Sequence, residues 1–203
     1  MKEEITAKIQ ADRVIAIIRL QEALQVGPMV ATLVGAGINV LEITSNTPDY
    51  GAAIQSARQK YPDVAVGAGT ITNTALALEA ISHGAQFLVT PNMNVEVIAA
   101  AHHAGIPAVM GAMTPTEIAL GIDHGADFIK LFPASLLGVA YLKALLGPFR
   151  GAKFLAVGGI GAENAPEWFR AGVSGIGVGG SIMAGETTAV TQAIKKLLHS
   201  IKS

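Results

Sequence analysis

The sequence alternates between short apolar runs of strand length and longer stretches with helical spacing, and this alternation limits the possible folds most. Each run is bounded by glycine, proline or small polar residues, which end a strand. The eight runs are Val14–Ile18, Asn39–Ile43, Val64–Gly67, Gln86–Thr90, Pro107–Met110, Asp127–Leu131, Lys153–Val157 and Ser174–Val178. We predict a strand at each.

Helical spacing occupies the stretches between these runs, and one further helix is predicted at Lys2–Gln10, before the first strand. Thr72 is a plausible N-cap for its helix. Glycine-containing links such as His83–Ala85 and His103–Gly105 lead from a helix into the next apolar run. The remaining predicted helices are Leu20–Ala36, Asp49–Lys60, Thr72–Ser82, Asn94–His103, Thr116–His124, Val139–Leu146, Ala162–Ala171 and Thr187–Lys202.

Eight strand–helix units in 203 residues match a compact α/β (β/α)₈ TIM barrel with an extra N-terminal helix. One barrel domain spanning 1–203 is expected. The alternative is a doubly wound open sheet, but no G-x-G-x-x-G motif follows the first strand.

Composition excludes several classes of function. The chain has no cysteine, which excludes disulfides, thiolate metal sites and a cysteine nucleophile. Its formal net charge of -1, with no basic stripe, argues against nucleic acid as a partner. We expect no secretion signal, no membrane span and a cytoplasmic location. Of the residues, 51% are hydrophobic and 14% are charged, which is apolar for a soluble protein. Either the chain exposes little surface, or part of its surface is buried in an oligomer.

In a (β/α)₈ barrel the chemistry sits at the carboxyl ends of the strands. Nearly every unusual residue of this chain falls there. In chain order these are Arg19, Glu42, Gly67–Thr70, Thr90–Asn92, Lys130, Gly158–Gly159 and Gly177–Ser181.

Lys130 is the most informative of them, because an ammonium in an apolar strand is costly unless it is paired or loses its proton. A neutral lysine can attack a ketone and form a Schiff base, with Glu42 beside it as general acid/base. The alternative is a structural ion pair between Lys130 and Glu42. A structural pair would be dry, whereas a catalytic pair would lie at a cavity.

The other strand-end residues suit an anionic substrate. Arg19 is a candidate clamp for carboxylate or phosphate, although a surface arginine is the common alternative. The glycine clusters follow the seventh and eighth strands, where this fold frequently holds phosphate, with Ser181–Ala184 as a candidate short helix. Tight turns are the alternative for these glycines.

The remaining candidates carry little chemistry. The five histidines, His83, His102, His103, His124 and His199, fall in helices or in the links before strands, so surface or capping roles are favoured over metal binding. Trp168 and Phe169 indicate packing, with an interface as a further option.

The chain resembles the 2-keto-3-deoxy-6-phosphosugar-acid (KDPG and KDPGal) aldolases along essentially its whole length. The resemblance implies a class I, Schiff-base, pyruvate-forming barrel, a homotrimer, a phosphorylated keto acid substrate, and no metal or organic cofactor. It also implies Lys130 as the Schiff-base lysine and Glu42 as the acid/base. The matching segments are Ala16–Arg19, Leu41–Thr44, Gly67–Thr70, Val89–Asn92, Ile129–Pro133, Val157–Ile160 and Gly177–Ser181.

The same resemblance assigns the two ends of the substrate. Arg19, Thr70 and Pro91 would line the pyruvyl end. The phosphate cradle would consist of Gly158, Gly159, Gly179, Gly180 and Ser181.

Two branches of this family act on substrates of opposite configuration at C4. The 6-phosphogluconate branch resembles Glu-x-Thr-x-Arg-Thr after the second strand and Pro-Thr-Gly-Gly after the seventh. Here Asn46 replaces the arginine and Val157 the threonine, as in the 6-phosphogalactonate branch. The galactonate substrate is therefore expected, with Asn46 and Val157 at the site. The gluconate epimer, or 4-hydroxy-2-oxoglutarate, is the alternative.

Two other functions remain open from the sequence. A phosphosugar isomerase on the same barrel would share the phosphate loops but form no imine. A non-catalytic trimeric scaffold would suit the apolar composition, although Lys130, Glu42 and both glycine clusters argue against it.

Overall fold

Eight parallel strands close into a barrel in sequence order, and β1 pairs with β8 to complete the ring. The computed structural model describes residues 1–183 and 185–202. The closed barrel confirms the predicted (β/α)₈ fold and excludes the open sheet. The strands are β1 (Val14–Ile18), β2 (Val40–Thr44), β3 (Ala65–Gly69), β4 (Leu88–Val89), β5 (Ala108–Ala112), β6 (Phe128–Leu131), β7 (Phe154–Val157) and β8 (Gly175–Val178).

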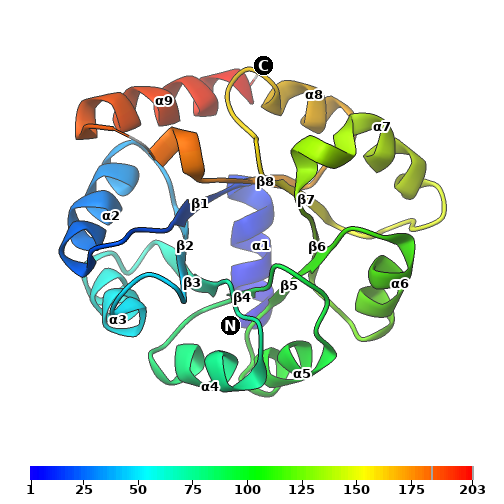
Figure 1. Ribbon diagram of the computed structural model, residues 1–203, viewed down its shortest axis with the longest axis horizontal. Coiled ribbons are helices and arrows are strands. Elements are labelled where there is room, and N and C mark those ends of the chain that lie inside the picture. The colour runs from blue at the N-terminus through cyan, green and yellow to red at the C-terminus, as the bar shows by residue number, and fades with distance from the viewer. Residues whose placement is uncertain (184, 203) are drawn as a thin grey trace.

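Helices surround this ring, and α1 occupies its centre in the view of Figure 1. Two short 3₁₀ segments, η1 (Ala23–Gln25) and η2 (Gly180–Met183), complete the described elements. The α-helices are α1 (Lys2–Asp12), α2 (Val26–Gly35), α3 (Tyr50–Lys60), α4 (Thr74–Ser82), α5 (Val95–His103), α6 (Pro115–Asp123), α7 (Ala134–Leu146), α8 (Ala165–Arg170) and α9 (Thr187–Ser200).

Several helix starts differ from the prediction for local reasons. The N-cap of α4 is Asn73, whose side chain accepts the Leu76 N–H, and not Thr72. α7 begins at Ala134 rather than at Val139, although Gly138, with a φ of 75°, interrupts its helical geometry. α8 begins only at Ala165, next to a proline at the start of the helix, where this residue is favoured.

The barrel interior is filled with apolar side chains toward the amino ends of the strands. Phe87, Phe128 and Leu155 belong to this inner cluster, and α1 adds Ile5 and Ile9 to it. The remaining buried apolar residues form a second cluster between the strands and the outer helices.

Polar contacts fix α1 across the amino end of the barrel. Lys2 pairs with Asp127 at 3.1 Å, and Asp127 immediately precedes β6. The Asp127 carboxylate also contacts His102 Nε2 at 2.9 Å and accepts the Ala108 N–H. α1 therefore covers the amino end of the barrel, and the large cavity lies at the other end. Across residues 1–183 and 185–202, the helices are too short or too polar to span a lipid bilayer.

Candidate active site

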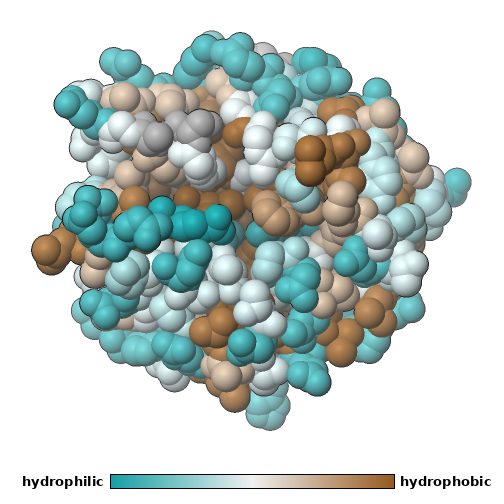
Figure 2. Space-filling view, in the orientation of Figure 1, coloured by the Kyte–Doolittle hydropathy of each residue, from teal (hydrophilic) through white to brown (hydrophobic). Residues whose placement is uncertain are grey.

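A cavity of about 570 Å³ opens at the carboxyl ends of the strands. Figure 2 shows this face, with apolar surface near its centre bordered by hydrophilic side chains. Ten of the predicted site residues line the cavity, namely Arg19, Glu42, Thr70, Pro91, Lys130, Val157, Gly158, Gly159, Gly179 and Gly180. Phe132, Ile160 and Met183 also line it and were not predicted.

Two of the predicted site residues are not among the described residues that line the cavity. Asn46 is exposed and lies outside the set of residues that line the cavity. Ser181 belongs to η2, and its side chain lies outside what the structure describes. The segment predicted as a short helix at 181–184 is thus a 3₁₀ turn over Gly180–Met183, and Ala184 lies outside the described residues.

Lys130 and Glu42 are both buried in the cavity wall, with 5% and 2% of their surface exposed. Burial raises the pKa of the Glu42 carboxyl, against an opposing effect of the Lys130 and Arg19 charges. Burial also lowers the pKa of Lys130, and the nearby Arg19 charge acts in the same direction, while Glu42 opposes it. Both shifts favour the neutral forms that Schiff-base chemistry requires.

The two groups do not form a direct ion pair. Among the described residues, no carboxylate oxygen lies within 4.0 Å of Lys130 Nζ. Its Nζ lies 5.0 Å from the centre of the Phe132 ring. Because both groups border an open cavity without touching, a small molecule or water can lie between them. This arrangement disfavours the structural ion pair.

Gly69 makes room for the Glu42 side chain. Gly69 ends β3 and is the partner of Thr44 on β2, two residues beyond Glu42. A Cβ atom built on Gly69 would overlap the Glu42 carboxylate. The carboxylate therefore packs against the bare backbone of β3, and only glycine leaves this position free.

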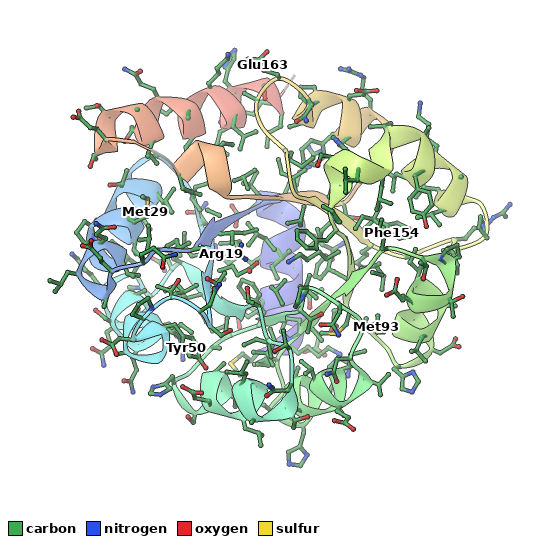
Figure 3. The ribbon with its side chains drawn as sticks, viewed as in Figure 1. Arg19, Met29, Tyr50, Met93, Phe154 and Glu163 are labelled. Carbon is green, nitrogen blue, oxygen red and sulfur yellow. The ribbon has the colours of Figure 1, made fainter. Side chains whose placement is uncertain are left out.

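Hydroxyl groups at and after the end of β2 hold the backbone on both sides of Arg19. Figure 3 shows Arg19 pointing inward from the end of β1. Thr44 donates to the Ile18 carbonyl, and the Leu20 N–H donates to the Thr47 hydroxyl. The backbone is thus held on both sides of Arg19.

Thr70 presents its hydroxyl to the same arginine. Arg19 Nη2 donates to Thr70 Oγ1 at 3.3 Å. Thr70 has a φ of 58°, a left-handed conformation that costs of order 1–3 kcal/mol for a non-glycine residue. The Ser45 hydroxyl donates to the Thr70 carbonyl at 2.8 Å and holds it there. Sequence reasoning missed Ser45 and Thr47, and the run of hydroxyl residues after Glu42 was the available signal.

The glycine clusters follow β7 and β8, and β8 is next to β1 in the ring. Gly158 and Gly159 have φ values of 99° and 74°, which other residues rarely adopt. A Cβ on Gly159 would also crowd the Ser135 side chain. Backbone atoms rather than side chains therefore face the cavity here, as an anion cradle requires.

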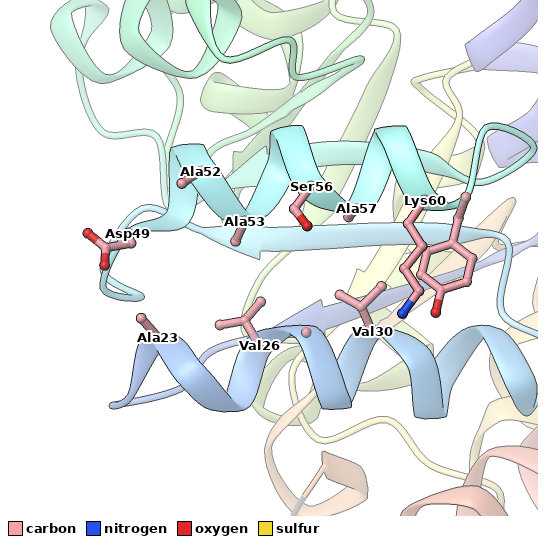
Figure 4. Close-up of a pocket in the computed structure, with 11 residues that line it drawn as sticks. Ala23, Val26, Val30, Asp49, Ala52, Ala53, Ser56, Ala57 and Lys60 are labelled. Atoms are coloured by element: carbon pink, nitrogen blue, oxygen red, sulfur yellow. The ribbon is translucent and has the colours of Figure 1, made fainter.

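Other parts of the molecule offer less chemistry. A smaller cavity of about 270 Å³ lies between α2 and α3, and mostly small or apolar residues line it (Figure 4). Across residues 1–183 and 185–202, no three histidine, aspartate or glutamate side chains are grouped to hold a metal ion. None of the five histidines lines the large cavity.

Comparisons with known proteins agree on one family. A family model described as "KDPG and KHG aldolase" matches residues 5–197. The 2-dehydro-3-deoxy-phosphogluconate aldolase of Treponema pallidum (strain Nichols) is 33% identical over 196 residues, which cover 93% of each chain. The 2-dehydro-3-deoxy-6-phosphogalactonate aldolase of Escherichia coli (strain K12) is 36% identical over 156 residues, which cover 75% of this chain and 76% of that one.

A solved structure described as "Native KDPGal structure" matches the fold closely. Its TM-score is 0.88 at 30% sequence identity, and the match covers 93% of this chain and 94% of that chain.

Proposed function

Since the chain belongs to the KDPG and KHG aldolase family of class I lyases, we propose that Lys130 forms a Schiff base with a 2-keto-3-deoxy-6-phospho sugar acid. The substrate is cleaved to pyruvate and glyceraldehyde 3-phosphate. The observation that carries the proposal is the position of Lys130, which is buried at the cavity wall and has no carboxylate in contact among the described residues.

The reaction follows from the protonation states of the pair. The neutral Lys130 amine attacks the C2 ketone to give a carbinolamine. Glu42, whose pKa is raised by burial, donates the proton with which the hydroxyl leaves as water, and an iminium remains. The resulting carboxylate takes the C4 hydroxyl proton, directly or through water. The C3–C4 bond breaks, and its electron pair enters the iminium to give an enamine. Glyceraldehyde 3-phosphate departs. Protonation of the enamine carbon and hydrolysis of the imine release pyruvate and restore Lys130.

The remaining residues hold the two ends of the substrate. Arg19 and Thr70 bind the carboxylate next to the ketone, with Pro91 against the pyruvyl carbons. The backbone amides near Gly158, Gly159, Gly179 and Gly180 bind the phosphate, joined by the Ser181 backbone. No metal or organic cofactor takes part in this scheme.

The favoured substrate is the 6-phosphogalactonate epimer. Val157 lines the cavity beside Gly158 and offers no hydroxyl for a hydrogen bond near C4. Asn46 does not line the cavity, so Val157 is the residue that supports this preference. Relatives named for both epimers match the chain, and the gluconate epimer is the alternative. Turnover measured with both epimers tests the preference, and a higher kcat/KM for the gluconate epimer would reverse it.

Trapping of the imine tests the reaction itself. Incubation with pyruvate and borohydride should add one reduced pyruvyl group to Lys130, as located by peptide mass spectrometry. Lys130→Met should abolish both adduct and turnover, whereas the exposed Lys143→Met should retain both. A wild-type protein without an adduct would point to an isomerase that forms no imine.

Assembly as a homotrimer, which would leave three such cavities per particle, is part of the proposal. Analytical ultracentrifugation of the full chain would give the mass of the particle directly.

A further inference from the structure

We propose that Asn164 is a positioning residue that holds the loop Gly158–Gly161 with its amide groups turned into the cavity, where they bind the phosphate. The inference rests on the proposed function and assigns the residue that orders its phosphate end. Asn164 does not line the cavity, so its effect on substrate passes through the loop.

The side chain of Asn164 is directed away from the helix that it precedes. Asn164 occupies the N-cap position of α8, where an asparagine usually accepts a hydrogen bond from the first turn. No such capping bond is present at α8. By contrast, Asn73 and Asn94 cap α4 and α5 in the usual way. Stabilising α8 by capping therefore does not explain this asparagine.

Asn164 instead bonds to two residues of the glycine loop. Its Oδ1 accepts the Gly161 N–H at 2.9 Å, and its Nδ2 donates to the Gly159 carbonyl at 2.9 Å. The opposite orientation of the amide would face donor with donor and acceptor with acceptor, so these two contacts fix the amide orientation. The Asn164 side chain thus links Gly159 to Gly161 through two hydrogen bonds.

The bonded carbonyls determine where the loop amides point. The Gly158 carbonyl accepts the Ser135 N–H at 3.0 Å, and the Gly159 carbonyl accepts Asn164. In a trans peptide the C=O and the following N–H point in opposite directions. The N–H groups of Gly159 and Ile160 therefore point away from Ser135 and Asn164.

Those two N–H groups are available to a ligand. Gly158, Gly159 and Ile160 all line the cavity. Within residues 1–183 and 185–202, neither the Gly159 nor the Ile160 N–H donates to a protein acceptor. Two adjacent donors on the wall of a cavity match the oxygens of a phosphate.

The loop needs an external restraint to keep this arrangement. Consecutive glycines with positive φ lose more conformational entropy on ordering than other residues do. Larger side chains cannot order the loop from within, because a Cβ on Gly159 would crowd Ser135. Asn164 supplies the restraint from the far side of the loop.

Removal of the side chain should weaken phosphate binding selectively. Asn164→Ala should raise the KM for the phosphorylated substrate and the inhibition constant of inorganic phosphate by about tenfold or more, as expected when hydrogen bonds to a charged group weaken. The pyruvate concentration that gives half-maximal borohydride trapping on Lys130 should stay unchanged, because the pyruvyl end is held by other residues. Circular dichroism checks that the variant is folded.

Two further variants make the test specific. Asn164→Asp keeps an acceptor for the Gly161 N–H but loses the donor to Gly159, so it should also raise the KM and serves if the alanine variant does not fold. Asn73→Ala removes a true helix cap and should lower thermal stability without moving the phosphate inhibition constant.

An unchanged KM and phosphate inhibition constant in the folded Asn164 variants would overturn the inference. An equal loss at the pyruvate and phosphate ends would do the same, since it would indicate a general structural role. If wild-type protein forms no pyruvate adduct at all, the proposed function fails first, and the inference that rests on it fails too.

Discussion

At the scale of single residues, the two buried ionisable groups work against the stability of the barrel that holds them. Burial destabilises the charged forms of both Glu42 and Lys130 relative to water. Such groups are retained for chemistry at a cost in stability. Replacing both by neutral residues of similar shape should therefore stabilise the fold while it abolishes activity.

The double variant Glu42→Gln/Lys130→Met tests this trade-off. Its free energy of unfolding should exceed that of the wild type by about 1–4 kcal/mol at neutral pH. Urea denaturation at matched protein concentration measures the difference, because assembly would make stability concentration-dependent. A double variant that is less stable than the wild type would show that the pair contributes net stability.

The difference in unfolding free energy between the double variant and the wild type should depend on pH, because the pKa of Glu42 is raised and that of Lys130 is lowered. For Glu42 the folded pKa lies above the unfolded one, so stability falls as pH rises from the unfolded value through the folded value. For Lys130 the folded pKa lies below the unfolded one, so stability rises as pH rises from the folded value to the unfolded value. The advantage of the double variant should therefore be largest at intermediate pH and smaller near ~pH 4 and ~pH 10.

Gly69 should matter to activity through Glu42 alone. Gly69→Ala should displace the carboxylate and lower kcat by about 10²-fold, the usual effect of misplacing a catalytic group by about 1 Å. Glu42→Gln should lower it by about 10²–10⁴-fold. Gly147→Ala is the matched control, because nothing lies within 4 Å of its added Cβ. Full activity in the Gly69 variant would contradict this account of how Glu42 is held.

At the scale of secondary-structure elements, a side chain extends the pairing of the short strand β4 with β5. Its regular ladder spans only Leu88 and Val89. The buried Thr90 hydroxyl then accepts the Gly111 N–H of β5 at 3.0 Å and donates to the Asn92 carbonyl. This bridge also positions Pro91 at the cavity wall.

Thr90→Val keeps the shape of the side chain and removes the bridge. The variant should lose about 1–3 kcal/mol of unfolding free energy, because the buried Gly111 N–H loses its acceptor. Chemical denaturation measures the loss, and the exposed Thr188→Val should change stability by less than about 0.5 kcal/mol. Equal stability of the two variants would show that water replaces the hydroxyl.

Element positions were predictable from apolar periodicity, but some boundaries were not. β1 lies at its predicted residues because apolar residues fill Val14–Ile18 between polar flanks. The start of α7 was missed because Gly138 resembles a helix boundary, whereas here the helical segment begins before it. α4 begins after Asn73 because this side chain, and not that of Thr72, reaches the first-turn amide.

The same limit applies to the site. Lys130 and Glu42 were predictable because a charge in an apolar strand needs an explanation. Ser45 and Thr47 were not, since each acts on the backbone of a distant loop that the sequence does not place beside it. Asn164 was missed because it lay inside the predicted helix Ala162–Ala171, whereas α8 begins after it.

At the scale of the whole molecule, stability and chemistry occupy opposite ends of the barrel. The inner apolar cluster and α1 fill the amino end, whereas the cavity occupies the carboxyl end. Substitutions at the amino end should therefore change stability with little effect on catalysis.

Ile9→Ala tests this separation. Ile9 is 1% exposed, and its truncation should cost about 2–5 kcal/mol of unfolding free energy. Below the melting temperature kcat/KM should stay at the wild-type value. Ile122→Ala, at a position 39% exposed, is the milder control. A parallel loss of kcat/KM would reveal coupling between the two ends.

Because α1 covers the amino end of the barrel, the cavity opens toward the carboxyl ends of the strands. Lys130 is level with Leu155, and Gly158 follows three residues farther along, about 10 Å in the direction of the strand and closer to the cavity opening. If Lys130 binds the keto group and the loop at Gly158 binds the phosphate, as proposed, the substrate has to enter keto end first. The phosphorylated fragment then has to leave before the fragment attached to the lysine, and in the synthetic direction pyruvate binds before the aldehyde.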